Sequence, residues 1–149
     1  MAPISIHTLA LLPILNGLKN AHAFISKAVV HCTTTSTPPS TLLEAKLHPT
    51  MHNFVYQVYR FTDAAKLIPM RLNPALADRE LKLPDTEQTF DELLARIQKT
   101  IDHLESYTES DFEGVDKETI VTVKFPQTGK GLRLGAGEYL AGQAHPNFW

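Results

Sequence analysis

The chain has 149 residues, of which 43% are hydrophobic and 20% are charged, a composition typical of one soluble globular domain over residues 1–149. Its net charge of −2 argues against a nucleic-acid-binding surface, which is usually basic, and no run of about 18 apolar residues predicts a membrane span. The single cysteine, Cys32, excludes an internal disulfide and fits a reducing, cytoplasmic location.

Helical periodicity dominates the beginning of the chain. Apolar residues return every three or four positions over residues 4–31, which predicts one long helix. Pro13 either kinks this helix or lies in its first turn, because proline has no N–H to donate in a helix interior. Residues 32–39 are rich in Thr, Ser and Pro and predict a loop.

A second helical region follows that loop. We expect it to begin at Ser40, and Pro49 must break or kink it. From residue 50 to about residue 72 an apolar stripe again repeats with helical spacing. Residues 73–84 show no such repeat, and they predict a connection to the next helix.

The third helix, over residues 89–106, has the clearest pattern in the sequence. Thr89 and Glu92 have the spacing of a capping box, in which each side chain bonds the backbone N–H of the other, and Asp85 is the alternative cap. Glu92 also precedes Arg96 by four residues. We therefore expect these two side chains to face solvent as a pair.

The periodicity then changes. Alternating β-branched and polar residues over 118–126 predict a strand, the glycines in 127–131 predict a turn, and 132–134 predict the returning strand. Helical spacing resumes over 138–149, where Pro146 suits the first turn of a helix. Together these elements predict a mainly α fold: an up-down bundle of the four-helix type, with a small β-hairpin between the third helix and a short last helix.

The best candidates for chemistry lie in the second helical region. Successive spacings of four, three and four residues place a set of polar side chains on one helical stripe: His52, Tyr56, Tyr59 and Asp63. If this stripe faces the bundle interior, these residues are catalytic candidates, with His52 as a base acting on a small organic molecule. The alternative is an amphipathic boundary, with half-buried tyrosines and Asp63 paired to Lys66 or Arg60.

The histidines do not predict a metal site. There are seven of them, mostly far apart, and none of the local spacings typical of zinc ligands occurs. We therefore expect no metal and no cofactor. Folding could still gather His7, His52 and His145 around a ligand. Asn147 is a further ligand-binding candidate beside Pro146, although such a side chain more commonly bonds nearby backbone.

Four segments, in order, resemble the landmarks of one protein family. They read LLEAKLHPTMHNFVYQVYRFTDAAKLIPMRL at 42–72, TFDELLARIQKTIDHLES at 89–106, DFEG at 111–114 and HPNFW at 145–149. The chain resembles a domain-of-unknown-function family of bacteria and fungi within the DinB/YfiT-like helical bundles. This resemblance implies a DinB-like bundle without an agreed reaction. Some members of the wider superfamily hold a metal through histidines.

Two departures from the family pattern affect the expected function. Related sequences often have Asp-His-Ala-Lys where this chain has DAAK at 63–66, so Ala64 stands at the histidine position and its methyl group cannot bind a metal. Related sequences also continue well beyond HPNFW. We therefore expect a fourth helix of roughly one third to one half of the family length. The exposed faces of its neighbours would then favour a homo-oligomer.

Three functions remain open from the sequence. The first is a metal-free acid–base enzyme, or an accessory protein of a small-molecule (secondary-metabolite) pathway, which binds a small organic ligand between helices. The second is a non-catalytic interaction module that dimerises through the open bundle face. The third is a metal-dependent hydrolase or transferase of the wider superfamily, which Ala64 and the early end of the chain disfavour.

Overall fold

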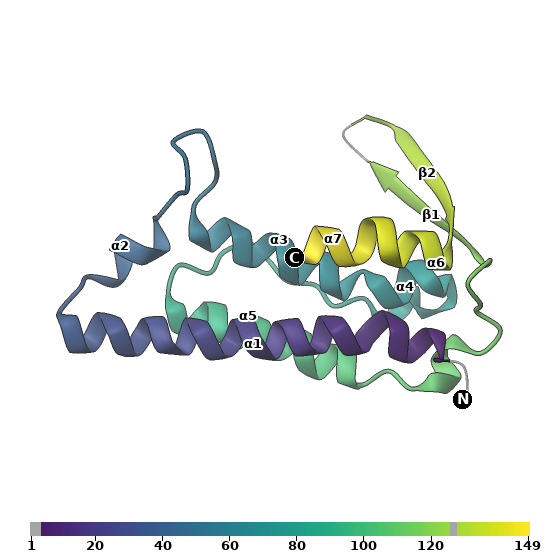
Figure 1. Cartoon of the computed structure of the whole chain (residues 1–149), viewed down its shortest axis with the longest axis horizontal. Helices are drawn as coiled ribbons and strands as arrows, with labels where there is room; N and C mark the ends of the chain where they lie inside the picture. The colour runs from purple at the N-terminus through teal and green to yellow at the C-terminus, as the bar shows by residue number, and fades with distance from the viewer. Residues whose placement is uncertain (1–3, 126–127) are drawn as a thin grey trace.

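A computed structural model describes residues 4–125 and 128–149 and contains a helical bundle. α1 (Ile6–Thr35) is the longest helix, and α5 (Phe90–Glu105) packs along it. α3 (Phe54–Lys66) packs on α5, and the last helical run lies against both α3 and α1. Figure 1 shows the two-stranded hairpin projecting from one end of this bundle. Across the described residues, none of the helices is both long and apolar enough to cross a membrane. The predicted four-helix type of fold is confirmed.

α1 extends further than the sequence predicted. Residues 33–35, all threonine, donate their hydroxyl hydrogens to carbonyl oxygens one turn earlier. Their side chains therefore find hydrogen-bond partners inside the helix, and the helix continues through them. The helix ends at Ser36, whose left-handed backbone (φ 55°) turns the chain so that the N–H of Thr37 also donates to the carbonyl oxygen of Cys32, at 3.0 Å. The loop predicted over 32–39 is therefore too long. Pro13 lies inside the helix, beyond its first turn.

A short helix and a loop precede α3. α2 (Pro39–Leu43) has only five residues. Residues 44–53 form a loop that contains the break predicted at Pro49. Asn53 ends this loop and caps α3, because its side chain accepts a hydrogen bond from the N–H of Tyr56 at 3.1 Å. The helical pattern expected from residue 50 therefore becomes a helix only after Asn53.

A second break divides the region that was predicted as one helix up to residue 72. α4 (Ile68–Leu72) follows α3 almost directly. Pro69, in the first turn of α4, has no N–H to donate to the carbonyl oxygen of Ala65, so the α3 ladder cannot continue. The following connection contains a 3-10 turn, η1 (Pro74–Arg79).

α5 begins where the sequence predicted. The Thr89 hydroxyl accepts from the N–H of Glu92 at 3.3 Å, and the Glu92 carboxylate accepts from the N–H of Thr89 at 3.0 Å. The capping box is therefore confirmed. The buried faces of α1, α3 and α5 meet in the core, which includes Leu11, Ile14, Leu18, Ile25, Val58, Leu93, Ile97 and Leu104.

The hairpin is anchored through one face. A 3-10 turn, η2 (Glu109–Phe112), follows α5 before the strands begin. β1 (Ile120–Phe125) pairs antiparallel with β2 (Lys130–Gly135), and the buried Val121 and Val123 turn β1 towards α4. The returning strand is longer than predicted. Residues 126 and 127, which the prediction placed at the strand end and in the turn, lie outside the described residues.

The last elements form one helical run. α6 (Ala136–Tyr139), η3 (Leu140–Ala144) and α7 (His145–Phe148) follow each other without a break. η3 is a π-turn, in which the N–H of His145 donates to the carbonyl oxygen of Leu140. This wider turn comes directly before Pro146, which has no N–H for a regular α-helical bond. The run begins at Ala136, close to the predicted residue 138, so Pro146 lies well inside it, and the expectation of a first-turn proline is wrong for the run as a whole.

Candidate functional site

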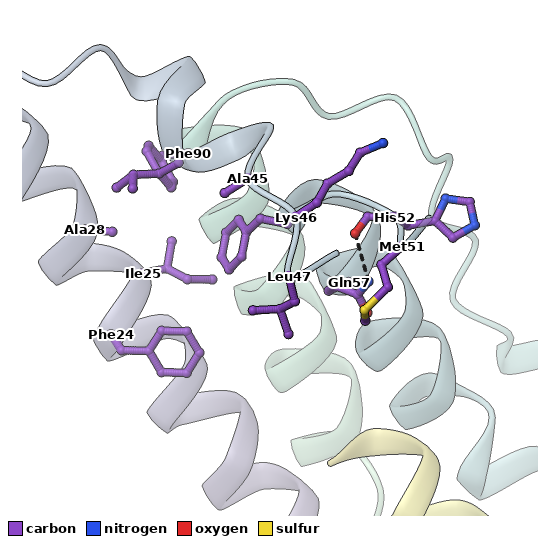
Figure 2. A pocket seen from close by; sticks show the side chains of 12 residues that line it. Phe24, Ile25, Ala28, Ala45, Lys46, Leu47, Met51, His52, Gln57 and Phe90 are labelled. Carbon is purple, nitrogen blue, oxygen red and sulfur yellow. Dashed lines mark hydrogen bonds between the residues drawn. The ribbon is translucent and has the colours of Figure 1, made fainter. Parts of the chain in front are cut away.

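A mainly apolar cavity of about 490 Å³ lies between α1, the 44–53 loop and the beginning of α3. Figure 2 shows its side chains converging from these segments. The lining includes Phe24 and Ala28 of α1, Leu47 and Met51 of the loop, Phe54 of α3 and Phe90 of α5. We call it the apolar cavity.

The loop over the apolar cavity exposes apolar side chains to solvent. Leu47 is 93% exposed and Met51 is 43% exposed. The loop is joined to α3 by a backbone bond of 2.9 Å from the N–H of Phe54 to the carbonyl oxygen of Ala45. On α1, Ala28 lies one turn beyond Phe24, and its small side chain leaves room between the helix and the loop. A ligand in this cavity would cover apolar surface that is now open to water.

Three polar residues also line the apolar cavity: Lys46, His52 and Gln57. Gln57 donates from Nε2 to the carbonyl oxygen of His52 at 3.4 Å. Figure 2 shows the Lys46 ammonium and the His52 ring turned to the same side of the loop, away from Phe24 and Ile25. The charged and titratable groups of the lining are therefore gathered at one edge.

That edge also borders a second, more polar cavity of about 280 Å³. Lys46 and His52 line both cavities, and Tyr56, Tyr59 and Asp85 are among the other residues of the polar one. The His52 ring stacks on the Tyr56 ring, with 3.8 Å between centroids and 22° between planes. We call this second space the polar cavity.

The structure brings three of the four predicted catalytic residues to the polar cavity: His52, Tyr56 and Tyr59. His52 is exposed and precedes α3, since Asn53 is the helix cap. The predicted stripe therefore runs along the edge of the bundle at its His52 end and turns inward at Tyr59, which is buried. The fourth residue, Asp63, does not line either cavity.

Tyr59 uses its hydroxyl to hold neighbouring backbone. The hydroxyl donates to the carbonyl oxygen of Glu87 at 2.5 Å. Burial raises the pKa of the Tyr59 phenol, and the negative charges of Glu87 and Asp85 raise it further. The phenol therefore stays protonated and keeps this hydrogen bond, which fastens the segment before α5 to α3.

Asp63 is surrounded by cations. Its carboxylate lies 2.7 Å from Nη2 of Arg60, 2.8 Å from Nζ of Lys66 and 3.2 Å from Nη2 of Arg96. The pairing with Arg60 and Lys66 is the one that the sequence left open as an alternative. A carboxylate held by three cations is suited to fixing the surrounding structure.

Arg96 is the important residue that sequence reasoning misplaced. Its guanidinium is buried, donating from Nη1 to the carbonyl oxygen of Pro84 at 2.9 Å and from Nη2 to Asp85 at 3.0 Å. It also pairs with the Glu87 carboxylate at 3.2 Å. The expected solvent-facing pair with Glu92 is wrong, because the Glu92 carboxylate closes the capping box instead.

The remaining predicted ligand-binding residues lie elsewhere and form hydrogen bonds within the fold. His7 Nε2 is 3.1 Å from the carbonyl oxygen of Tyr107, and His145 Nε2 is 3.4 Å from that of Ala10. Asn147 donates to a glutamine side chain one turn earlier at 3.4 Å. None of the three lines the apolar or the polar cavity, so the fold does not gather them with His52.

The residues around Ala64 do not fit the histidine-held metal site of the wider superfamily. Ala64 is half-buried on α3 and offers only a methyl group, and its neighbour Asp63 is already bound to cations. Within residues 4–125 and 128–149, no three His, Cys, Asp or Glu side chains form a group that could hold a metal.

Comparison with known proteins agrees with this fold. Residues 6–149 match the family described as a domain of unknown function (DUF1993). A solved structure of a DinB family member protein from Shewanella denitrificans superposes with a TM-score of 0.81 at 28% sequence identity, covering 95% of this chain and 77% of that one. No curated protein matches the chain. With nearly all of its residues matched, the chain belongs to the DUF1993 family and has a DinB-like helical fold.

Proposed function

We propose that the protein binds a small, mainly apolar organic molecule in the apolar cavity. The observation that carries this proposal is a space of about 490 Å³ whose wall is apolar apart from Lys46, His52 and Gln57. Small-molecule sites in proteins commonly have this size and this character. A ligand would shield Leu47 and Met51 from water, and each square ångström of apolar surface so buried contributes about 25 cal/mol.

We further propose that His52 and Tyr56 supply acid–base groups to the bound molecule. An imidazole can accept a proton near neutral pH, and a phenol can donate a hydrogen bond to developing negative charge. The stacked pair stands beside the apolar cavity, whereas Tyr59 and Asp63 are engaged in fixing the surrounding structure. This assignment suits a metal-free enzyme or an accessory protein that holds an intermediate of a small-molecule pathway.

Binding of N-phenyl-1-naphthylamine, a neutral dye that becomes fluorescent in apolar surroundings, tests the proposed cavity. We expect the wild-type protein to bind the dye and Ala28→Phe to weaken binding by filling the space. Ala23→Phe is the matched control, because Ala23 is exposed on the same helix and does not line the cavity. Equal dye affinity in the two variants would contradict the assignment.

The same region favours a second candidate function, self-association. The last helical run covers α1 at Gly17, but Phe24, about two turns further along the same face, remains 55% exposed. We propose that a second copy of the chain covers this exposed part of α1. Size-exclusion chromatography with light scattering should then give a dimer, and Phe24→Glu should give a monomer. A wild-type monomer at all concentrations would contradict this candidate.

A further inference from the structure

We propose that the ligand is an amphipathic carboxylic acid, with its hydrocarbon part in the apolar cavity and its carboxylate at the edge formed by Lys46 and His52. This inference rests on the proposed function and adds the chemical class of the ligand. It follows from the junction between the two cavities, since Lys46 and His52 are the residues that both cavities share.

The charges around the apolar cavity favour an anion. Lys46 is the one charged residue in its described lining, which includes no Asp or Glu. Nor does the Lys46 ammonium form an ion pair within residues 4–125 and 128–149. Asp85, which lines the polar cavity, already has its charge balanced, because its carboxylate lies 3.0 Å from both Arg60 and Arg96.

The shape of the edge suits the end of an amphipathic molecule. The aliphatic stem of a lysine can lie along apolar surface while its ammonium reaches water. Figure 2 shows the Lys46 ammonium extending beyond the loop on the same side as the His52 ring. A carboxylate emerging there would meet a cation and an imidazole, whereas an ammonium group would meet an uncompensated positive charge.

Displacement of N-phenyl-1-naphthylamine by three probes of equal chain length tests the inference: octanoate, octanol and octylammonium. We expect octanoate to displace the dye from the wild-type protein better than the other two. Lys46→Glu should lower the affinity for octanoate by about fivefold or more and raise the affinity for octylammonium. The affinity for octanol should not change. Lys46 is exposed, so folding should be unaffected, and circular dichroism checks this.

Lys27→Glu is the matched control, because it makes the same change of charge at an exposed position of α1 that lines neither cavity. Its octanoate affinity should remain close to that of the wild-type protein. Equal octanoate affinities in the two variants, or equal displacement by all three probes, would overturn the carboxylate assignment and leave the cavity proposal standing. Failure of the wild-type protein to bind the dye would overturn both.

Discussion

Arg96 on α5 donates its Nε hydrogen to Oγ1 of Thr62 on α3 at a distance of 2.8 Å, and neither residue is more than 1% exposed. The same guanidinium bonds Asp85, in the segment that leads into α5. A buried cation is tolerated only when its hydrogens are bonded and its charge is balanced. Arg96 therefore connects two helices and the segment between them at one point.

Arg96→Met should lower the free energy of unfolding strongly. Removal of one partner from a buried ion pair costs about 3–5 kcal/mol, because the other charges lose their compensation. Asp63 would keep Arg60 and Lys66 as partners, so we expect a loss of about 3 kcal/mol, at the lower end of that range. Urea unfolding followed by circular dichroism measures it.

The control for that variant is the exposed pair between Lys19 and Glu105, whose side chains are 54% and 47% exposed. Exposed pairs contribute about 0–1 kcal/mol, since water and salt screen them. Lys19→Met should therefore change the free energy of unfolding by no more than about 1 kcal/mol. Similar losses in the free energy of unfolding of the two variants would show that the buried Arg96 contributes no more to stability than an exposed ion pair.

Arg96 also shows which parts of the fold the sequence could predict. The capping box of Thr89 and Glu92 was predicted correctly because both residues and their bonds lie within one helical turn. The environment of Arg96 was predicted wrongly because the spacing rule considers only neighbours on the same helix. Its partner Thr62 is 34 residues away in the sequence, so only the packing of α3 against α5 brings the two together.

Gly17→Ala should destabilise the packing of the last helical run. A Cβ at residue 17 would lie 2.7 Å from Cη2 of Trp149 and even nearer to the Phe148 ring, closer than real Cβ atoms approach. Alanine favours a helix by about 1 kcal/mol over glycine, but overpacking costs about 1–3 kcal/mol. We expect a net loss of stability and a change in the fluorescence of Trp149, the single tryptophan.

Gly142→Ala is the control that separates the effect of helix propensity from the effect of packing. A Cβ at Gly142 meets nothing within 4 Å, so this variant gains helix propensity without a clash. Its urea midpoint should equal or exceed that of the wild-type protein. If Gly17→Ala behaved like Gly142→Ala, the close approach of α7 to α1 would be contradicted.

Stability should fall as the pH is lowered through the range in which His103 titrates. Partial burial lowers the pKa of His103, and the positive charges of Arg79 and Lys66 lower it further. Between that lowered pKa and the ordinary value of about 6.5, the unfolded chain binds more protons than the folded chain. The contribution of neutral His103 to stability is therefore complete above about pH 7.5 and is lost as the pH falls below about 6.5.

Comparison of urea midpoints at about pH 7.5 and pH 5.5 tests this titration. His103→Gln removes the group, so its midpoint should fall less than that of the wild-type protein between these two values. His31→Gln is the control, because His31 is exposed near the other end of the bundle, on α1. If the urea midpoint of His103→Gln fell as much as that of the wild-type protein, the titration of His103 would not contribute to the pH dependence of stability.

The candidate site was predicted only in part. Helical spacing predicted that His52 lies beside Tyr56, and the two rings do stack, although His52 lies in the loop before α3 and not in the helix. The apolar cavity could not be predicted in the same way, because Phe24, Leu47 and Phe90 come from separate segments that meet only after folding. A weak signal was present in the loop, where Leu47 occurs among polar residues in a region that cannot bury it.

His52→Ala should reduce ligand binding with little effect on folding. His52 is exposed and its ring forms no side-chain hydrogen bond among the described residues, so its removal leaves no buried group without a partner. His52 nevertheless lines both cavities. We therefore expect weaker displacement of the dye by octanoate at an unchanged urea midpoint.

The matched variant is His48→Ala, because His48 lies in the same loop, is exposed, and its side chain bonds only Thr50 within the described residues. Both variants remove one imidazole from one loop, so a general effect on loop conformation would appear in both. A loss of octanoate affinity in His52→Ala alone assigns the effect to the position of that ring. Unchanged affinity in His52→Ala would remove His52 from the binding site, and with it the proposed base.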